Sequence, residues 1–164
     1  MKALFDKIVW RIFNRKPDVV IGGKESPYLL RWFVIPRNPF LNIYLHEFHR
    51  PDDDRALHDH PWMWASYVID GQYVEHTIKS GLPVQRLRKP GSWAFRLPKT
   101  AHRIELEKGL VSDDGRQLYF RCWTLFITGP RIRNWGFNCP QGWVPWQLFT
   151  DPKDSGATGK GCDQ

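Results

Sequence analysis

The sequence lacks the features that identify a secreted disulfide scaffold, a thiolate metal site or a helical membrane protein. Its three cysteines, Cys122, Cys139 and Cys162, are widely spaced and form no CxxC pair. We therefore expect neither a disulfide framework nor a cysteine-ligated zinc ion. No apolar run reaches the roughly 18 residues of a membrane-spanning helix, and no secretory leader with a cleavage site is present. These absences predict a cytoplasmic protein.

Nucleic-acid binding has little support beyond charge. The formal net charge is +7, but the lysines and arginines are scattered, and no helix-turn-helix, zinc-finger or RNA-recognition signature occurs. A basic chain is also compatible with an anionic membrane surface or an acidic substrate. We favour a soluble basic protein and keep nucleic acid as a weak hypothesis.

The composition favours an all-β fold. Thirteen glycines and thirteen prolines are spread along 164 residues, and aromatic residues make up 15% of the chain. Many short segments joined by turns are typical of a sandwich or barrel. Asp70-Gly71 is a strong hairpin signal, and Gly109 to Gly115 indicates a polar loop. We expect strands in the ranges 28–35, 41–48, 62–69, 72–78, 83–88, 92–96, 101–106 and 117–128, with 133–137 and 143–149 as last strands or a covering flap.

The two ends of the chain differ from this pattern. Residues 2–16 predict a short amphipathic helix with a basic face, which we expect to pack on its own domain rather than lie on a membrane. The last residues are polar and rich in glycine. We therefore divide the chain into an N-terminal helix and lead-in (1–27), a β-barrel (28–149) and a flexible polar tail (150–164).

His58-Asp59-His60 is the motif around which the functional hypothesis is built. On an extended strand, residues i and i+2 point to the same face, so two imidazoles can bind one metal ion. Imidazole suits zinc, copper, iron and nickel alike. A surface pair beside the acidic run 52–54 is the plainer interpretation of two histidines alone, and His102 as a third ligand favours a metal site.

The spacing of these histidines resembles the cupin superfamily. Cupins carry a His-x-His motif followed by a glycine, and then a second motif that runs from a glycine through a proline to a histidine. Here His58-Asp59-His60 precedes Gly71, and Gly91 precedes Pro98 and His102. The resemblance covers residues 40–128 and implies a double-stranded β-helix, also called a jelly-roll barrel.

The chain departs from the cupin pattern at one ligand position. The family's glutamate ligand would fall near Trp64, where no ligand is present. The resemblance then implies a three-histidine site, as in some cupin thiol dioxygenases, with Fe(II) favoured and Zn or Ni as alternatives. Glu75 is a candidate fourth ligand, ahead of His76.

A second resemblance is more specific but carries no reaction. The segments 44–46, 52–62 and 135–143 are similar to small cupin-like proteins of bacterial viruses and prophages. This likeness places the protein in the cytoplasm of a bacterial cell or phage host.

Other residues are expected around the site by strand alternation. An inward arginine would bind a carboxylate or phosphate, and tryptophans would exclude water. Structural roles are the plainer interpretation of Tyr44, His46 and the tryptophans, and Cys122 is expected to be a buried small residue. The candidate pocket residues are Tyr44, His46, Trp64, Tyr73, Arg96, Arg121 and Trp123.

Three functions remain open at this stage. The first is a metal-dependent cupin enzyme, an iron(II) oxygenase acting on a small polar molecule. The second is a metal-independent module that binds a ligand. The third is an isomerase or epimerase that uses His60 or His102 as a base without metal. A homodimer is a further expectation, by analogy with cupins.

Overall fold

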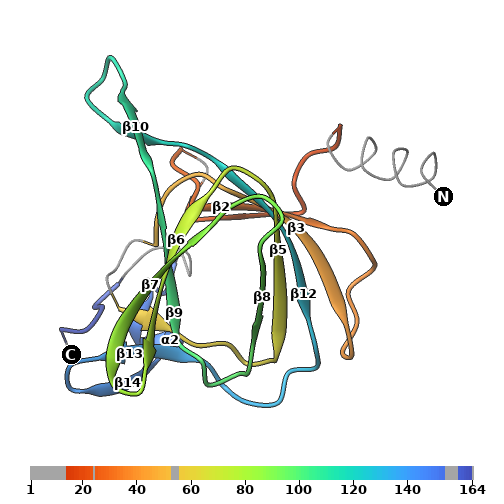
Figure 1. Cartoon of the computed structure of the whole chain (residues 1–164), viewed down its shortest axis with the longest axis vertical. Helices are drawn as coiled ribbons and strands as arrows, with labels where there is room; N and C mark the ends of the chain where they lie inside the picture. The colour runs from red at the N-terminus through yellow and green to blue at the C-terminus, as the bar shows by residue number, and fades with distance from the viewer. Residues whose placement is uncertain (1–13, 24, 53–55, 154–158, 164) are drawn as a thin grey trace.

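The chain folds into two antiparallel six-stranded sheets that face each other and form a barrel (Figure 1). The structure is a computed structural model, and it describes residues 14–23, 25–52, 56–153 and 159–163. This architecture is consistent with the predicted all-β barrel of the cupin type. The predicted helix from Lys2 to Lys16 lies almost entirely outside the described residues.

The first sheet shows the alternation expected from the sequence. Along β12 (Cys122–Thr128) every second side chain is buried, because successive residues of a strand point to opposite faces. In this sheet β12 pairs on one side with β3 (Asn42–Phe48) and on the other with β5 (Trp64–Asp70), although both are far from it in sequence. The strand order is β1 (Val19–Ile21), β2 (Leu29–Phe33), β3 (Asn42–Phe48), β12 (Cys122–Thr128), β5 (Trp64–Asp70) and β8 (Trp93–Arg96).

The second sheet carries the histidine motif. Its strand order is β14 (Gly142–Pro145), β13 (Gly136–Cys139), β4 (Leu57–His58), β9 (His102–Leu106), β6 (Tyr73–Lys79) and β7 (Leu82–Arg88). A separate hairpin, β10 (Lys108–Val111) with β11 (Gln117–Tyr119), projects from the barrel at the upper left of Figure 1. One short helix, α2 (Trp146–Phe149), follows β14.

A hydrophobic cluster fills one end of the space between the sheets. Leu29, Phe48 and Val68 of the first sheet meet Tyr73 and Leu106 of the second. His102 and Leu106 lie at opposite ends of β9. The histidine motif therefore lies toward the other end, where the barrel is not closed by this cluster.

Asp70-Gly71 makes a turn, but the expected hairpin is wrong. β5 and β6 belong to different sheets, so the turn carries the chain across the barrel. Gly71 has φ +72°, and a Cβ atom there would collide with the backbone of Arg121 and Cys122. Glycine is therefore required for a close approach of two chain segments as well as for its positive φ.

Three other expectations differ from the structure. The range 109–115, expected as a loop, begins within β10, and the single strand expected over 117–128 is divided into β11 and β12. The break falls where the chain leaves its pairing with β10 and joins the first sheet. The range 143–149 is strand only to Pro145 and then helical.

The expectation that the cysteines form no disulfide is wrong. Cys139 and Cys162 are bonded, with Cα atoms 5.4 Å apart. The chain returns to β13 because the N–H groups of Gly159 and Gly161 both donate to the carbonyl of Phe149. The described part of segment 150–164 is thus attached to the barrel, and β1 already pairs with β2 before residue 28. Disulfides are most common in oxidising compartments, so the cytoplasmic location stays a prediction.

No helix among the described residues is long and apolar enough to cross a membrane. Cys122, as expected, is a buried small residue with no exposure, and burial raises the pKa of its thiol to about 12.

We expect Cys162→Ser to lower the free energy of unfolding by about 3 kcal/mol, because the bond restricts the unfolded chain. Urea denaturation of the variant and the wild type measures this difference. A reductant should lower the stability of the wild type to that of the variant and leave the variant unchanged. A wild type whose stability is insensitive to reductant would contradict the structural role of the bond.

Candidate metal centre

Three imidazoles meet at the open end of the barrel. His58 is paired in register with His102 on β9 and with Phe137 on β13. His60 follows β4, and its N–H donates to the carbonyl of Pro98 (3.1 Å). Strands β4 and β9 and the loop between β8 and β9 therefore place the three rings, as the sequence motif predicts for residues i and i+2 and a neighbouring strand.

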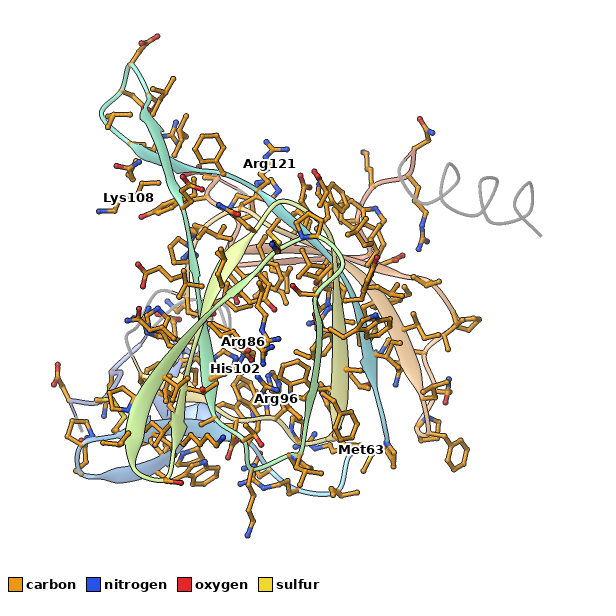
Figure 2. All side chains as sticks on the ribbon, in the orientation of Figure 1. Met63, Arg86, Arg96, His102, Lys108 and Arg121 are labelled. Carbon is orange, nitrogen blue, oxygen red and sulfur yellow. A yellow bond between two sulfur atoms is a disulfide. The ribbon has the colours of Figure 1, made fainter. Side chains whose placement is uncertain are left out.

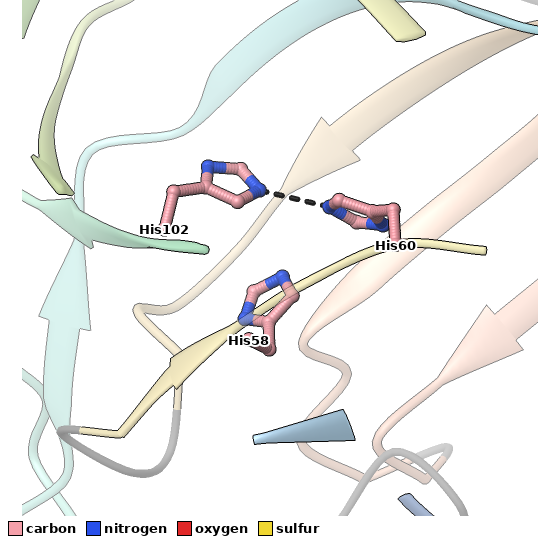
Figure 3. Close-up of side chains that lie close together, drawn as sticks. All are labelled: His58, His60 and His102. Carbon is pink, nitrogen blue, oxygen red and sulfur yellow. Dashed lines mark hydrogen bonds between the residues drawn. The ribbon is translucent and has the colours of Figure 1, made fainter. Parts of the chain in front are cut away.

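The three rings form a nearly equilateral triangle (Figure 3). The ring centroids of His58 lie 5.1 Å from His60 and 4.9 Å from His102, and those of His60 and His102 lie 5.1 Å apart. One nitrogen from each ring lies within 4.8 Å of the others. The Nε2 atoms of His60 and His102 are 2.9 Å apart, which suits two ligands of one ion and also suits a direct hydrogen bond.

Two carboxylates lie behind the triangle. Asp52 Oδ2 is 3.8 Å from His58 Nδ1, and Glu75 Oε1 is 3.5 Å from His102 Nδ1. Each carboxylate faces Nδ1, which leaves Nε2 for the centre. Metal-binding histidines commonly have a carboxylate on the second nitrogen, which sets the ring orientation and tautomer.

Glu75 belongs to a buried network that joins the two sheets. Its Oε2 accepts hydrogen bonds from Arg88 Nε (2.8 Å) and Arg96 Nη2 (2.7 Å). Burial raises its pKa, but the hydrogen bonds with His102 and Arg88 and the charge of Arg96 outweigh this and lower the pKa to about 2. Arg96 and His102, labelled in Figure 2, thus approach one carboxylate from opposite sheets.

Burial keeps His58 and His60 neutral at neutral pH. It lowers the pKa of His58 to about 4, although Asp52 acts in the opposite direction. Burial also lowers the pKa of His60 well below its usual value, and His102 and His58 add to this effect. Neutral imidazole is the form that binds metal, so these two rings need release no proton at neutral pH.

Asp59, between the two histidines of the motif, points the other way. Its carboxylate accepts from the N–H of Gly136 (2.9 Å) and from Trp143 Nε1 (3.1 Å), and it pairs with Arg133 (2.7 Å). These contacts bind the histidine segment to β13 and β14. Strand alternation predicts that Asp59 points away from the face that carries His58 and His60, but its partners could not be predicted from the sequence.

The histidines line a cavity of about 380 Å³ between the sheets. Its wall is mainly aromatic, and Asp52 is the one acidic residue that lines it in the described part of the chain. The aromatic wall includes Trp62, Trp64, Phe126, Trp135, Phe137 and Trp146.

The structure brings together only some of the residues that the sequence placed around the pocket. His46, Trp64 and Tyr73 line the cavity. Tyr44 does not line the cavity but packs against His46, with ring centroids 5.8 Å apart. Arg96 does not line it either and pairs with Glu75, which faces His102. Two others do not line it: Arg121 pairs with Glu47 and is 62% exposed, and Trp123 stacks on Trp32.

Sequence reasoning missed Arg31 and Arg88. Arg31 interrupts the apolar strand β2, and Arg88 ends β7 with only 3% of its side chain exposed. The signal available was a lone arginine within or next to a strand, but the many other arginines of this chain gave no reason to choose these two.

The donor set fits a divalent metal ion. Three imidazoles offer nitrogen atoms within reach of one ion, and two of them have carboxylates on their outer nitrogens. Glu75, the candidate fourth ligand, faces Nδ1 of His102 and both arginines, on the side away from the His60–His102 contact.

Comparisons with known proteins find likeness in structure alone. No protein-family model matches this chain, and no curated protein sequence matches it. One similar structure is a Ralstonia eutropha JMP134 protein provisionally assigned as a mannose-6-phosphate isomerase, with 16% identity, a TM-score of 0.48, and coverage of 69% of this chain and 92% of that chain. Another is hydroxypropylphosphonic acid epoxidase from S. wedmorenis, with 15% identity, a TM-score of 0.47, and coverage of 70% and 57%.

The EutQ protein of Clostridium difficile is similar at 14% identity and a TM-score of 0.44, with coverage of 69% of this chain and 75% of that chain. The match spans little more than half of the epoxidase chain. These likenesses are too distant to assign a reaction or ligand to this chain, and the likeness to proteins of bacterial viruses stays a prediction.

We expect Glu75→Gln to destabilise the fold by about 3 kcal/mol, because it leaves Arg88 and Arg96 without a counter-charge in a buried site. It should also weaken metal binding about tenfold, because His102 loses its charged partner. Urea denaturation and titration with Zn²⁺ measure the two effects.

The matched control is Glu105→Gln on the neighbouring strand. Glu105 pairs with Arg103 and is 50% exposed, so we expect a change of less than about 1 kcal/mol. Equal effects of the two substitutions would contradict a special role for Glu75.

Proposed function

We propose that this protein is a metal-binding cupin whose three-histidine centre holds Fe(II) and oxygenates a small polar molecule. The observation that supports this proposal is the convergence of His58, His60 and His102 in a cavity without a carboxylate ligand among the described residues. Zinc and nickel remain alternatives, because imidazole binds all three metals.

Three protein ligands on one side of an ion favour chemistry on the other side. Iron(II) held by these three histidines would supply redox chemistry between O₂ and a substrate. The chain's own residues would do the rest. His58, His60 and His102 bind the ion, Asp52 and Glu75 orient two of the rings, and the tryptophans and phenylalanines of the wall limit access of water.

A metal-independent function has one observation in its favour. The 2.9 Å contact between the Nε2 atoms of His60 and His102 has the length of a direct hydrogen bond. In that arrangement one ring is a proton donor and the other an acceptor, which suits an isomerase or epimerase base. A binding module on the same barrel would use the cavity without any reaction.

The partners stay proposals as well. A small molecule fits a cavity of about 380 Å³. A homodimer would bury the exposed apolar side chains of the edge strands, such as Leu82 on β7 and Phe95 on β8. Edge strands with unpaired backbone groups are common sites of association.

Elemental analysis of freshly purified protein, prepared without a histidine tag, tests the proposal. We expect about one iron per chain in the wild type. In a His58→Ala, His102→Ala double variant the affinity for iron should fall by more than about tenfold, so that little iron is retained on purification. The matched control is His76→Ala, because His76 lies outside the cavity and contacts Arg103 and Glu105.

Full metal occupancy in the double variant would exclude this centre. Zinc or nickel in place of iron would direct the search to hydrolase or isomerase chemistry. No metal in either protein would favour the metal-independent alternative.

A further inference from the structure

Arg31 brings a positive charge into the cavity from the side of the first sheet. It lies in the middle of β2, lines the cavity and is only partly exposed. Burial lowers the pKa of its guanidinium below the ordinary value. Among the described residues no carboxylate forms an ion pair with it, in contrast to Arg88, Arg96 and Arg133, which all have acidic partners.

The contacts that Arg31 does make are with neutral groups. Its Nε donates to Nε2 of His46 (2.9 Å), and its guanidinium lies 4.8 Å from the centre of the Tyr44 ring. These contacts position the side chain but do not neutralise its charge. In the described part of the chain no group accepts a hydrogen bond from the terminal nitrogens, which leaves the fork that binds oxyanions free.

A second polar group lies in the same row of the sheet. The register places Arg31 opposite His46, and His46 opposite Thr124 on β12. Thr124 lines the cavity and is 1% exposed, and its hydroxyl has no hydrogen-bond partner among the described residues. A buried hydroxyl without a partner is costly, and an acceptor supplied by a ligand would remove this cost.

This row lies close to the histidine triangle. The ring of Phe126 stacks on His46 at 5.1 Å and lies 6.0 Å from His60. The rings of His46 and Phe126 therefore connect Arg31 to His60, and Arg31 lines the same cavity as the three histidines.

The charge of the cavity favours an anion. Asp52 is the one acidic side chain among the residues that line it, and Asp52 already accepts from the backbone N–H of Ile104 (2.6 Å) and faces His58. With three neutral ligands, a divalent ion would keep its full charge and add to that of Arg31. The excess positive charge is best balanced by a ligand that carries at least one negative charge.

We propose that the cavity binds a small organic oxyanion whose carboxylate, phosphate or phosphonate group is held by Arg31, with Thr124 beside it. The rest of the molecule extends past Phe126 toward His58, His60 and His102. The second part of this inference rests on the proposed metal centre, whereas binding of the anion by Arg31 does not.

Isothermal titration of metal-free protein with inorganic phosphate, methylphosphonate and acetate tests the anion site, with methylammonium as a cation of similar size. We expect at least one of the anions to bind and methylammonium not to bind. The preferred probe separates a phosphate or phosphonate site from a carboxylate site.

Arg31→Met should weaken anion binding by more than about tenfold, because charge-assisted hydrogen bonds are lost. Arg37→Met is the matched control. It removes the same charge from an exposed side chain that lies over Phe33 and does not line the cavity, and it should leave binding unchanged. Thr124→Val, which keeps the shape of the side chain, should weaken anion binding by a smaller factor. It tests the same site if Arg31→Met does not fold.

The measurements separate this inference from the proposed function. Metal content should be the same in Arg31→Met and the wild type. The anion site would be overturned if the wild type holds metal but binds none of the anions. It would also be overturned if Arg31→Met and Thr124→Val bind the anions as tightly as the wild type does. A chain that binds an anion through Arg31 but holds no metal would support the anion site and overturn the metal centre.

Discussion

The carboxylate of Glu75 connects the parts of this structure on which the candidate site depends. It receives hydrogen bonds from Arg88 on β7 and Arg96 on β8 and lies against His102 on β9. A buried carboxylate with two arginines is stable only when all its partners are in place. The position of His102 is thereby linked to the distance between the two sheets, because Arg96 comes from one sheet and Glu75 from the other.

Burial decides the chemical state of the site as much as its shape. The aromatic wall removes water from the histidines, and this desolvation lowers the pKa of His58 and His60. The same low polarity makes an unpaired charge costly. Glu75 is therefore paired with Arg88 and Arg96, and Asp59 with Arg133. Arg31 has only the neutral partners His46 and Tyr44 among the described residues.

Much of the barrel could be predicted from alternation and turn residues. Strands such as β5, β6 and β9 lie close to their expected ranges, because one face of each is more deeply buried and the sequence must show that period. The three histidines were also predicted, since His58 and His60 share a face and His102 follows the second cupin motif. The errors occurred where pairing between distant segments matters. Asp70-Gly71 looks like a hairpin locally, but its two strands belong to different sheets.

The sequence by itself determined the strand periods, the sharp turns and the residue types able to bind a metal ion. These properties depend on neighbours within a few positions along the chain. Only the tertiary structure decided that Glu75 faces His102 and two arginines, that Arg31 enters the cavity while Arg121 does not, and that Cys162 reaches Cys139. The physical reason is that the charge and reactivity of a side chain depend on its burial and on partners from distant strands, and neither follows from local sequence.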